Sequence, residues 1–217
     1  MPLSRRDELN QYYQNMLVAQ YQASENISHA PSKGTARENF VKDIVKRTKG
    51  SELKIYRGVF ECGDAWQSNE ADFIWQRQGE VSEFGTYNLH DSRMMMEIKS
   101  CSTGNEIKKL NEQATKLKSL HDDRKNFKVG MFCYGTQLKK NTVLERFGHP
   151  YDDELMSSMI YDNSKDIYNN IDFLFSLDLN NEEEPEPYFI FRQKEDTSLY
   201  TDHPVVYRFL LMFGDKR

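Results

Sequence analysis

Apolar positions along the chain follow two spacings, and each spacing predicts a different kind of element. Recurrence at three and four residues predicts amphipathic helices, over residues 7–21, 35–49, 104–120, 153–161 and 204–213. Short alternating or continuous apolar runs predict strands, over residues 53–62, 71–75, 94–99, 127–134, 171–177 and 188–192. Segments rich in Ser, Asn, Gly, Pro and charged residues separate these elements and predict loops, over residues 24–34, 63–70, 79–91 and 180–187.

The order of these elements predicts an α/β fold with a mixed central sheet flanked by helices. Two strands, a helix and a further strand follow one another over residues 71–134, which is typical of a crossover with its helix packed on one face of a sheet. A chain of 217 residues can bury the core of one such domain. We predict an N-terminal helix and loop at residues 1–33 and a single domain at 34–217, with its core at 34–135 and a C-terminal elaboration at 136–217.

Composition narrows the class of protein. The aromatic content of 12% is too high for a disordered chain, and the mean hydropathy of −0.79 with no long apolar run excludes a transmembrane helix. The chain turns polar at residue 4 and has no apolar run of the kind that forms the core of a signal peptide. We therefore expect a cytoplasmic protein. The three cysteines, Cys62, Cys101 and Cys133, lack the spacing of a metal site, and we expect them to be buried, reduced thiols.

Charge is distributed unevenly along the chain, although the net charge is only −5. Residues 99–146 contain eleven Lys or Arg and five Asp or Glu, whereas residues 147–217 contain six and fifteen. The basic block could steer a polyanionic substrate, while the acidic block argues against a broad surface that coats DNA non-specifically. Two solvated faces are an equally good interpretation of the charge alone.

The strand predicted at residues 94–99 ends in an acid and an amine two positions apart. In a strand, Glu97 and Lys99 point to one face and Ile98 points to the other. Metal-assisted phosphodiester hydrolysis requires an oxygen ligand for a hard divalent cation and a positive charge that holds the attacking water. The pair supplies both groups; an ordinary surface ion pair is the alternative interpretation.

Two further acid-x-Lys triplets lie in less suitable contexts. Glu106 and Lys108 fall in a predicted helix, where residues two apart diverge by about 200°. Glu52 and Lys54 open a strand directly after a turn, with no acidic strand before them. Only the triplet at residues 97–99 ends an apolar strand that follows a second acid-bearing strand.

That preceding strand carries a single charge, Asp72, near its start. An acid in a buried strand is costly unless it is paired, hydrogen-bonded or bound to a metal. The interval between Asp72 and Glu97 is long for a simple hairpin. It therefore leaves Asp64, Glu70 and Asp91 as alternatives to Asp72.

Glu38 borders the apolar stripe of the helix predicted to begin at Thr35. It can complete a capping box with Thr35, or it can reach toward a site beneath the helix. The residues alone leave both interpretations open.

Taken in order, these residues resemble the motifs of a known group of enzymes. Glu38 on a first helix, Asp72 on a strand, residues 97–99 on the next strand and Gln113 on the following helix resemble the PD-(D/E)xK nuclease superfamily. The sequence Gly-Thr-Ala-Arg-Glu at residues 34–38 is also similar to the Gly-x-x-Arg-Glu start of a family of uncharacterised bacterial domains.

The resemblance covers about residues 34–135 and departs from the superfamily pattern in places. Ala71 stands where the motif has Pro, and Leu117 stands where a Tyr would follow Gln113 by four positions. The resemblance implies a restriction-endonuclease-like core. It also implies Mg²⁺, with Mn²⁺ as the alternative, bound by Asp72, Glu97 and the backbone carbonyl of Ile98.

The resemblance implies roles for the remaining motif residues. Lys99 would orient or deprotonate the attacking water, Glu38 would hold a metal-bound water or a second ion, and Gln113 would fix Lys99 or a phosphate. Basic residues of the predicted helix at 104–120 would contact the nucleic acid; these are Lys108, Lys109, Lys116 and Lys118.

The function implied is a metal-dependent endo- or exonuclease that acts on DNA rather than RNA, with a role as an effector in bacterial (antiviral) defence. The alternative from another class is a catalytically inactive nucleic-acid-binding or assembly subunit that works through a protein partner or as a homo-oligomer. A phosphodiesterase acting on a small nucleotide is a third interpretation. No membrane partner is expected.

Overall fold

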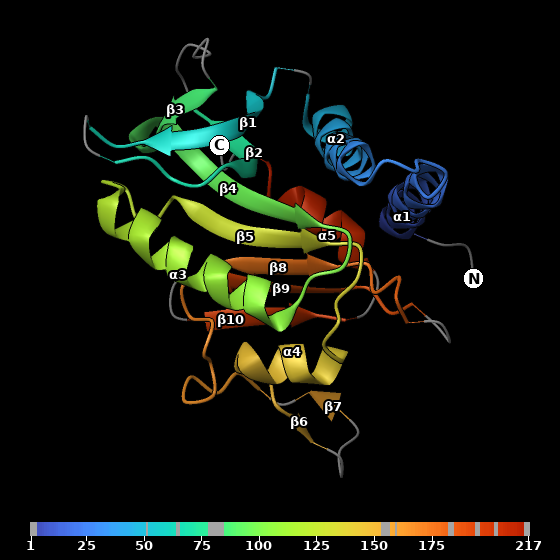
Figure 1. Ribbon diagram of the computed structural model, residues 1–217. Helices are drawn as coiled ribbons and strands as arrows, with labels where there is room; N and C mark the ends of the chain where they lie inside the picture. The colour runs from blue at the N-terminus through green and yellow to red at the C-terminus, as the bar shows by residue number, and fades with distance from the viewer. Residues whose placement is uncertain are drawn as a thin grey trace.

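The chain folds as helices on both faces of one long mixed sheet in the computed structural model (Figure 1), which describes residues 4–50, 52–63, 66–77, 85–152, 157–158, 160–181, 185–193, 196–201 and 204–214. The helices are α1 (Arg5–Ser24), α2 (Ala30–Lys49), α3 (Gly104–Leu120), α4 (Lys140–Arg146), α5 (Val205–Leu211) and the short 3-10 helix η1 (Leu89–Asp91). The strands are β1 (Ile55–Glu61), β2 (Ala71–Gln76), β3 (Thr86–Asn88), β4 (Ser92–Lys99), β5 (Lys128–Cys133), β6 (Tyr151–Asp152), β7 (Ser157–Ser158), β8 (Phe173–Ser176), β9 (Tyr188–Gln193) and β10 (Asp196–Tyr200).

Eight strands form the main sheet in the order β10-β9-β8-β5-β4-β2-β1-β3. The central strands β4, β5 and β8 are parallel, and α3 makes the crossover from β4 to β5. Antiparallel strands extend the sheet on both sides, with β2 and β1 beyond β4, and β9 and β10 beyond β8. The predicted mixed α/β fold is therefore confirmed.

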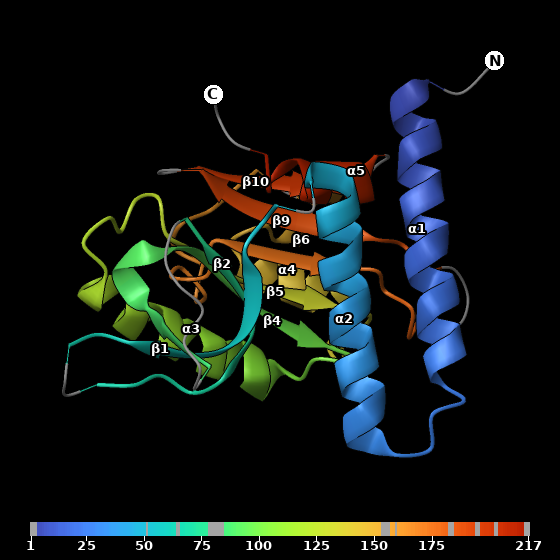
Figure 2. The ribbon, with the colours of Figure 1, turned by 90° about the horizontal axis from the view of Figure 1, so that it is seen from above.

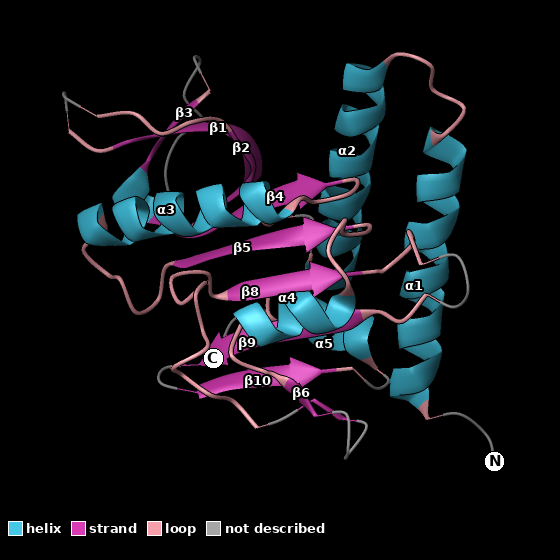
Figure 3. Ribbon diagram, turned by 60° about the horizontal axis from the view of Figure 1, so that its bottom comes forward, coloured by secondary structure: helices cyan, strands magenta, loops and turns pink. Residues whose placement is uncertain are grey.

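The two faces of the sheet bury separate cores. On one face, α3 and α4 pack against β4 and β5 through residues that include Leu110, Leu144 and Met95. On the other face, α1, α2 and α5 pack around Phe209 and Met96. Figure 3 shows the arrows of β4, β5 and β8 pointing toward the side where α1 and α2 stand. This arrangement brings the middle of α2 to the carboxyl end of β4.

Arg37 joins α1 to α2, which lie side by side in Figure 2. Its guanidinium is buried, donates a 2.8 Å hydrogen bond to Ser24 Oγ, pairs with Glu25 and lies 4.0 Å from the ring centroid of Tyr21. Neighbouring helical residues point about 100° apart, so Glu38 turns away from α1. The predicted domain boundary after residue 33 falls within α2.

The start of α2 corrects one prediction. The helix begins at Ala30 with His29 as its N-cap, whose ring nitrogen accepts from Ser32 N, and Pro31 lies in the first turn. Proline is favoured there because the first backbone N–H groups of a helix have no intrahelical partner. Thr35 therefore lies inside the helix. The predicted loop over residues 24–34 is present at 25–29 only, and the interpretation of Glu38 as half of a capping box with Thr35 is wrong.

Other differences concern short elements. The helix predicted at 153–161 is wrong where the structure describes this stretch, because β7 lies there and pairs with β6; residues 153–156 and 159 lie outside the described residues. The sequence pattern did not predict β3, β10 or α4. The remaining predicted helices and strands are present with ends that shift by a few residues.

Candidate active site

Asp72 and Glu97 meet across the antiparallel pair of β2 and β4. Pairing of Phe73 with Met96 places Asp72 opposite Glu97, and β3 and η1 take up the long interval between them. The backbone N–H of Ile98 donates a 2.9 Å hydrogen bond to Asp72 Oδ2. The N–H and C=O of one strand residue point to the same side, so the carbonyl of Ile98 also faces β2.

Lys99 binds both acids from the end of β4. Its Nζ lies 2.7 Å from Glu97 Oε2 and 3.4 Å from Asp72 Oδ2. Met95 packs in the core beneath α3, and alternation along the strand places Glu97 and Lys99 on that same face. The predicted acid and amine therefore share one side of the sheet.

The electrostatics of the cluster are unusual for carboxylates. The pKa of Glu97 is raised from its ordinary 4.5 to about 7, chiefly by burial; the charge of Asp72 raises it further, and Lys99 opposes both effects. Burial alone would lower the pKa of Lys99, but the two neighbouring carboxylates outweigh it and raise that pKa. Lys99 therefore carries its proton at neutral pH, and Glu97 is close to a protonation change.

Glu38 approaches the same cluster from α2. Burial raises its pKa, and the charge of Asp72 raises it further. Glu38 Oε2 lies 3.4 Å from Arg57 and 3.9 Å from Lys42, but this buried oxygen has no hydrogen-bond partner. Since Thr35 is not the N-cap of α2, Glu38 is left facing the site.

Two basic residues of the site, Lys42 and Arg57, were not predicted from the sequence. Lys42 follows Glu38 by one helical turn, and its pKa is lowered chiefly by burial. Arg57 lies on β1 and is held by Glu70, whose Oε1 accepts a 2.9 Å hydrogen bond from Nε. The spacing of four residues on α2 could have indicated Lys42, whereas Arg57 becomes a neighbour only through the pairing of β1 with β2.

A local irregularity in β2 lies at the site. Tyr56 pairs with Ile74 and Gly58 pairs with Ala71, so one residue of β1, Arg57, faces two residues of β2. Those two residues are Asp72 and Phe73. Such a bulge bends the strand and redirects the side chains beside it, and bulges are enriched near active sites. The bulge therefore helps to set the direction of Asp72.

The three alternative acids take other positions. Glu70 is occupied by its bidentate pair with Arg57, with distances of 2.9 and 3.1 Å. Asp91 ends η1, at the far end of β4 from Lys99. Asp64 lies outside the described residues. Among the acids that the structure describes, Asp72 is thus the candidate supported by contacts to Lys99.

Gln113 and the predicted nucleic-acid contacts lie on α3. The Nε2 atom of Gln113 is buried without a hydrogen-bond partner, and Gln113 takes no part in the ion pairs that join the other site residues described here. Lys118 is not available to a phosphate in this structure, because it pairs at 2.8 Å with Asp172. The other predicted contacts are exposed; these are Lys108, Lys109 and Lys116.

Comparison with solved structures identifies the fold. The chain superposes on P. aeruginosa ATCC27853 NucC in a cAAA-bound form with a TM-score of 0.72 and 10% identity, covering 98% of this chain and 90% of that one. For E. coli MS115-1 NucC the cAAA-bound form gives 0.69 at 8% identity, covering 98% and 89%. Its apo form gives 0.62 at 8%, covering 94% and 88%. The fold is restriction-endonuclease-like. No family model and no curated protein sequence matches the chain.

The donor atoms of the site fit a hard divalent cation. Asp72 and Glu97 offer carboxylate oxygens, the carbonyl of Ile98 faces the same strand pair, and Glu38 adds a buried oxygen that accepts no hydrogen bond. Lys99 now bridges the acids, and the described part of the chain has no ready-made group of three metal-ligating side chains. A cation would therefore have to share the carboxylates with the Lys99 ammonium.

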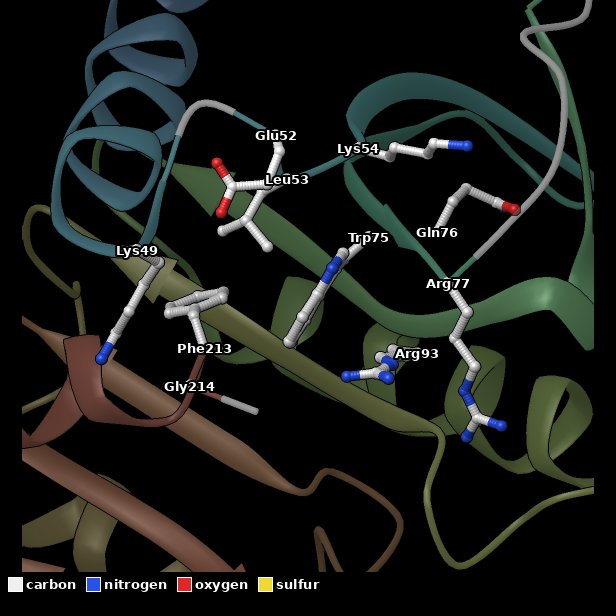
Figure 4. Close-up of a pocket in the computed structure, with 10 residues that line it drawn as sticks. All are labelled: Lys49, Glu52, Leu53, Lys54, Trp75, Gln76, Arg77, Arg93, Phe213 and Gly214. Atoms are coloured by element: carbon white, nitrogen blue, oxygen red, sulfur yellow. The ribbon is translucent and has the colours of Figure 1, made fainter. Parts of the chain in front are cut away.

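A separate pocket of about 240 Å³ opens at the end of β2 opposite to Asp72, beside Trp75 and Gln76. It lies on the sheet face that α2 and α5 cover (Figure 4). Trp75 stands between Phe213 and Arg93 in this view, and the guanidinium carbon of Arg93 lies 5.3 Å from the ring centroid of Trp75. Basic side chains dominate the charged part of its lining; these are Lys49, Lys54, Arg77 and Arg93, with Glu52 as the acid. These side chains give the pocket an excess of positive charge beside the planar ring of Trp75.

Proposed function

We propose that this chain is a metal-dependent nuclease that hydrolyses phosphodiester bonds of DNA. The observation that carries the proposal is the convergence of Asp72, Glu97 and Lys99 across β2 and β4 of a restriction-endonuclease-like fold. The similarity to NucC supports a role in bacterial defence. We also propose that the chain is related to the bacterial domains that begin with Gly-x-x-Arg-Glu. No helix in the described ranges is long and apolar enough to cross a membrane.

In this proposal Asp72, Glu97 and the carbonyl of Ile98 would hold Mg²⁺ or Mn²⁺. The bound ion would supply Lewis-acid stabilisation of the charge that develops on the phosphate. The chain would bind it only after Glu97 loses its proton, and the ion would favour that loss because it attracts the carboxylate.

The protein side chains would orient the water and receive its proton. The raised pKa of Lys99 favours the orienting role over the deprotonating role, because a protonated Nζ donates hydrogen bonds and cannot accept a proton. Glu38 has a raised pKa, and its Oε2 accepts no hydrogen bond, so that oxygen is a candidate proton acceptor. Arg57, one of whose amino groups is held by Glu70, and Lys42 would offset the negative charge of a phosphate at the mouth of the site. Gln113 keeps its proposed role of fixing Lys99 or a phosphate.

The test is a cleavage panel with plasmid DNA, single- and double-stranded DNA oligonucleotides, matched RNA and small dinucleotides. Each substrate is incubated with Mg²⁺, Mn²⁺ or EDTA. We expect metal-dependent cleavage of DNA that EDTA abolishes. DNA binding without cleavage in either metal would instead favour the inactive binding or assembly subunit, and cleavage of dinucleotides alone would favour a small-nucleotide phosphodiesterase.

Exposed lysines on α3 are expected to carry part of the DNA affinity. Replacing both Lys108 and Lys109 by Ala should lower the slope of log affinity against log salt by about 2, because each lost phosphate contact removes roughly one released counterion. The control is Lys165→Ala, an exposed lysine outside α3. An unchanged salt slope in the double variant would move the DNA path away from this helix.

We further propose that the basic pocket beside Trp75 binds a small anionic ligand that regulates the nuclease, with cAAA as the compound to test. The proposal rests on the lining of the pocket and on the cAAA-bound NucC structures that the chain resembles. In a Trp66→Phe background, Trp75 is the remaining tryptophan. We expect cAAA to change its fluorescence saturably, and Arg93→Ala to weaken this change at least tenfold. An unchanged fluorescence at saturating cAAA would contradict the proposal.

A further inference from the structure

A Cys, a His and an Asp lie in contact at the end of the sheet opposite to Lys99. The Sγ atom of Cys62 is 3.6 Å from Nε2 of His90, and Nδ1 of His90 is 3.2 Å from Oδ2 of Asp122. Cys62 follows β1, His90 lies in η1, and Asp122 follows α3, so three separate segments bring these groups together. The seven steps of β4 from Ser92 to Lys99 place this cluster roughly 20 Å from the proposed active site.

The geometry assigns a direction to the proton on His90. The carboxylate of Asp122 attracts the hydrogen to Nδ1, which leaves the lone pair of Nε2 facing the thiol. The backbone N–H of Asp122 also lies near Nδ1, at 3.4 Å, and would favour the opposite tautomer. The contact with the charged carboxylate is the shorter of the two, at 3.2 Å, and its attraction for a proton on Nδ1 is electrostatic.

A second histidine nearby is held in another role. His121 lies 5.9 Å from His90 between ring centroids; its Nε2 is 3.1 Å from Ser92 O, and its Nδ1 accepts from Asp123 N. Burial lowers the pKa of His121, so this ring stays neutral and does not repel a proton on His90. His90 is thus the ring positioned to act as a base toward Cys62.

The three thiols differ in exposure, which corrects the expectation that all are buried. Cys133 is buried and Cys101 is exposed, whereas Cys62 is half-buried. The side chain of His90 is one-third exposed. The thiol and its base are therefore open to a small reagent but lie against the core residues beneath η1 and α3.

We propose that Cys62, His90 and Asp122 form a second reactive site, with Cys62 as nucleophile, His90 as base and Asp122 as the residue that positions His90. The constellation of nucleophile, base and orienting acid is the one that activates weak nucleophiles in covalent catalysis. The reagent class that fits is a low-molecular-weight disulfide, and the product is a mixed disulfide on Cys62.

The step balances without a further reactant. Cys62 sulfur attacks one sulfur of the disulfide, a new S–S bond forms, and the S–S bond of the reagent breaks. The thiol proton passes to His90 Nε2 and from there to the departing thiolate. Cys62 is oxidised and the released thiol is reduced.

The experiment treats the full-length chain with oxidised glutathione or iodoacetamide and follows each cysteine by mass spectrometry. We expect Cys62 to be modified first, and His90→Ala to slow its modification at least tenfold. Asp122→Asn should slow it severalfold. The matched control is Asp123→Asn, one position away, because Asp123 pairs with Arg77 and not with His90.

Two results would overturn the site: a Cys62 rate that His90→Ala leaves unchanged, or an equal loss in Asp122→Asn and Asp123→Asn. The buried Cys133 reports on folding, because it reacts only when the core opens. If His90→Ala exposes Cys133, His90→Gln replaces it in the comparison. The measurement needs no DNA cleavage, so its outcome is separate from that of the nuclease assay.

Discussion

Replacing Lys99 by Ala is expected to lower the rate of DNA cleavage by about 10²- to 10³-fold while the chain stays folded. The ammonium is protonated and bound to Glu97 and Asp72, so it can orient the water and stabilise charge in the transition state. Its removal leaves both carboxylates in place to bind metal. Single-turnover cleavage with saturating Mg²⁺ measures the effect on the chemical step.

The ion pair of Lys140 with Glu186 supplies a matched control. Its two charged atoms are 2.6 Å apart, and Lys140 is half-buried like Lys99 but starts α4, away from the site. Lys140→Ala should cleave at the rate of the parent. Full activity in Lys99→Ala would sink the proposed mechanism, and so would an unfolded Lys99→Ala variant of a parent that never shows metal-dependent cleavage.

Replacing Glu97 by Gln is expected to remove metal binding as well as activity, with a rate loss of at least about 10²-fold. The amide keeps the shape of the side chain but lacks the negative charge that a divalent cation requires. Calorimetry with Mg²⁺ or Mn²⁺ should show weakened binding in this variant, whereas Lys99→Ala should retain it. Glu186→Gln is the control, since it removes a carboxylate from the remote ion pair.

The raised pKa of Glu97 also predicts how stability depends on pH. Folding strengthens proton binding to this group, so its contribution to stability is fully present below pH 4.5 and is lost as the pH rises toward 7. Glu97→Gln should remove that loss and make the metal-free chain relatively more stable at neutral pH. Denaturant unfolding in EDTA at several pH values measures this, and an unchanged pH profile would contradict the assignment.

Much of the site was predictable because it depends on local periodicity. Alternation in β4 is enough to place Glu97 and Lys99 on one face, and the single charge of β2 indicated Asp72. The sequence could not predict which face of the sheet carries Glu97 and Lys99, or that Arg57 contacts Glu38. Both depend on the pairing of β1 with β2 and on where α2 crosses the strand ends.

The wrongly predicted and the missed elements of the fold have local causes. Pro31 and Gly34 indicated a loop, yet proline is compatible with the first turn of a helix, and packing of Val41 and Ile44 against the sheet outweighs one helical glycine. The strands β3 and β10 are short elements near the edges of the sheet, held by pairing with β1 and β9, and they carry little periodic signal.

The bulge in β2 bears on how relatives of this chain should be aligned. Side chains alternate along a strand, so losing one residue there would turn those on one side of the loss to the opposite face. Asp72 or the core residues after it would then leave their positions. Gaps are thus expected outside residues 71–76 even where almost every side chain has changed, and the length of this strand should identify distant relatives better than its composition.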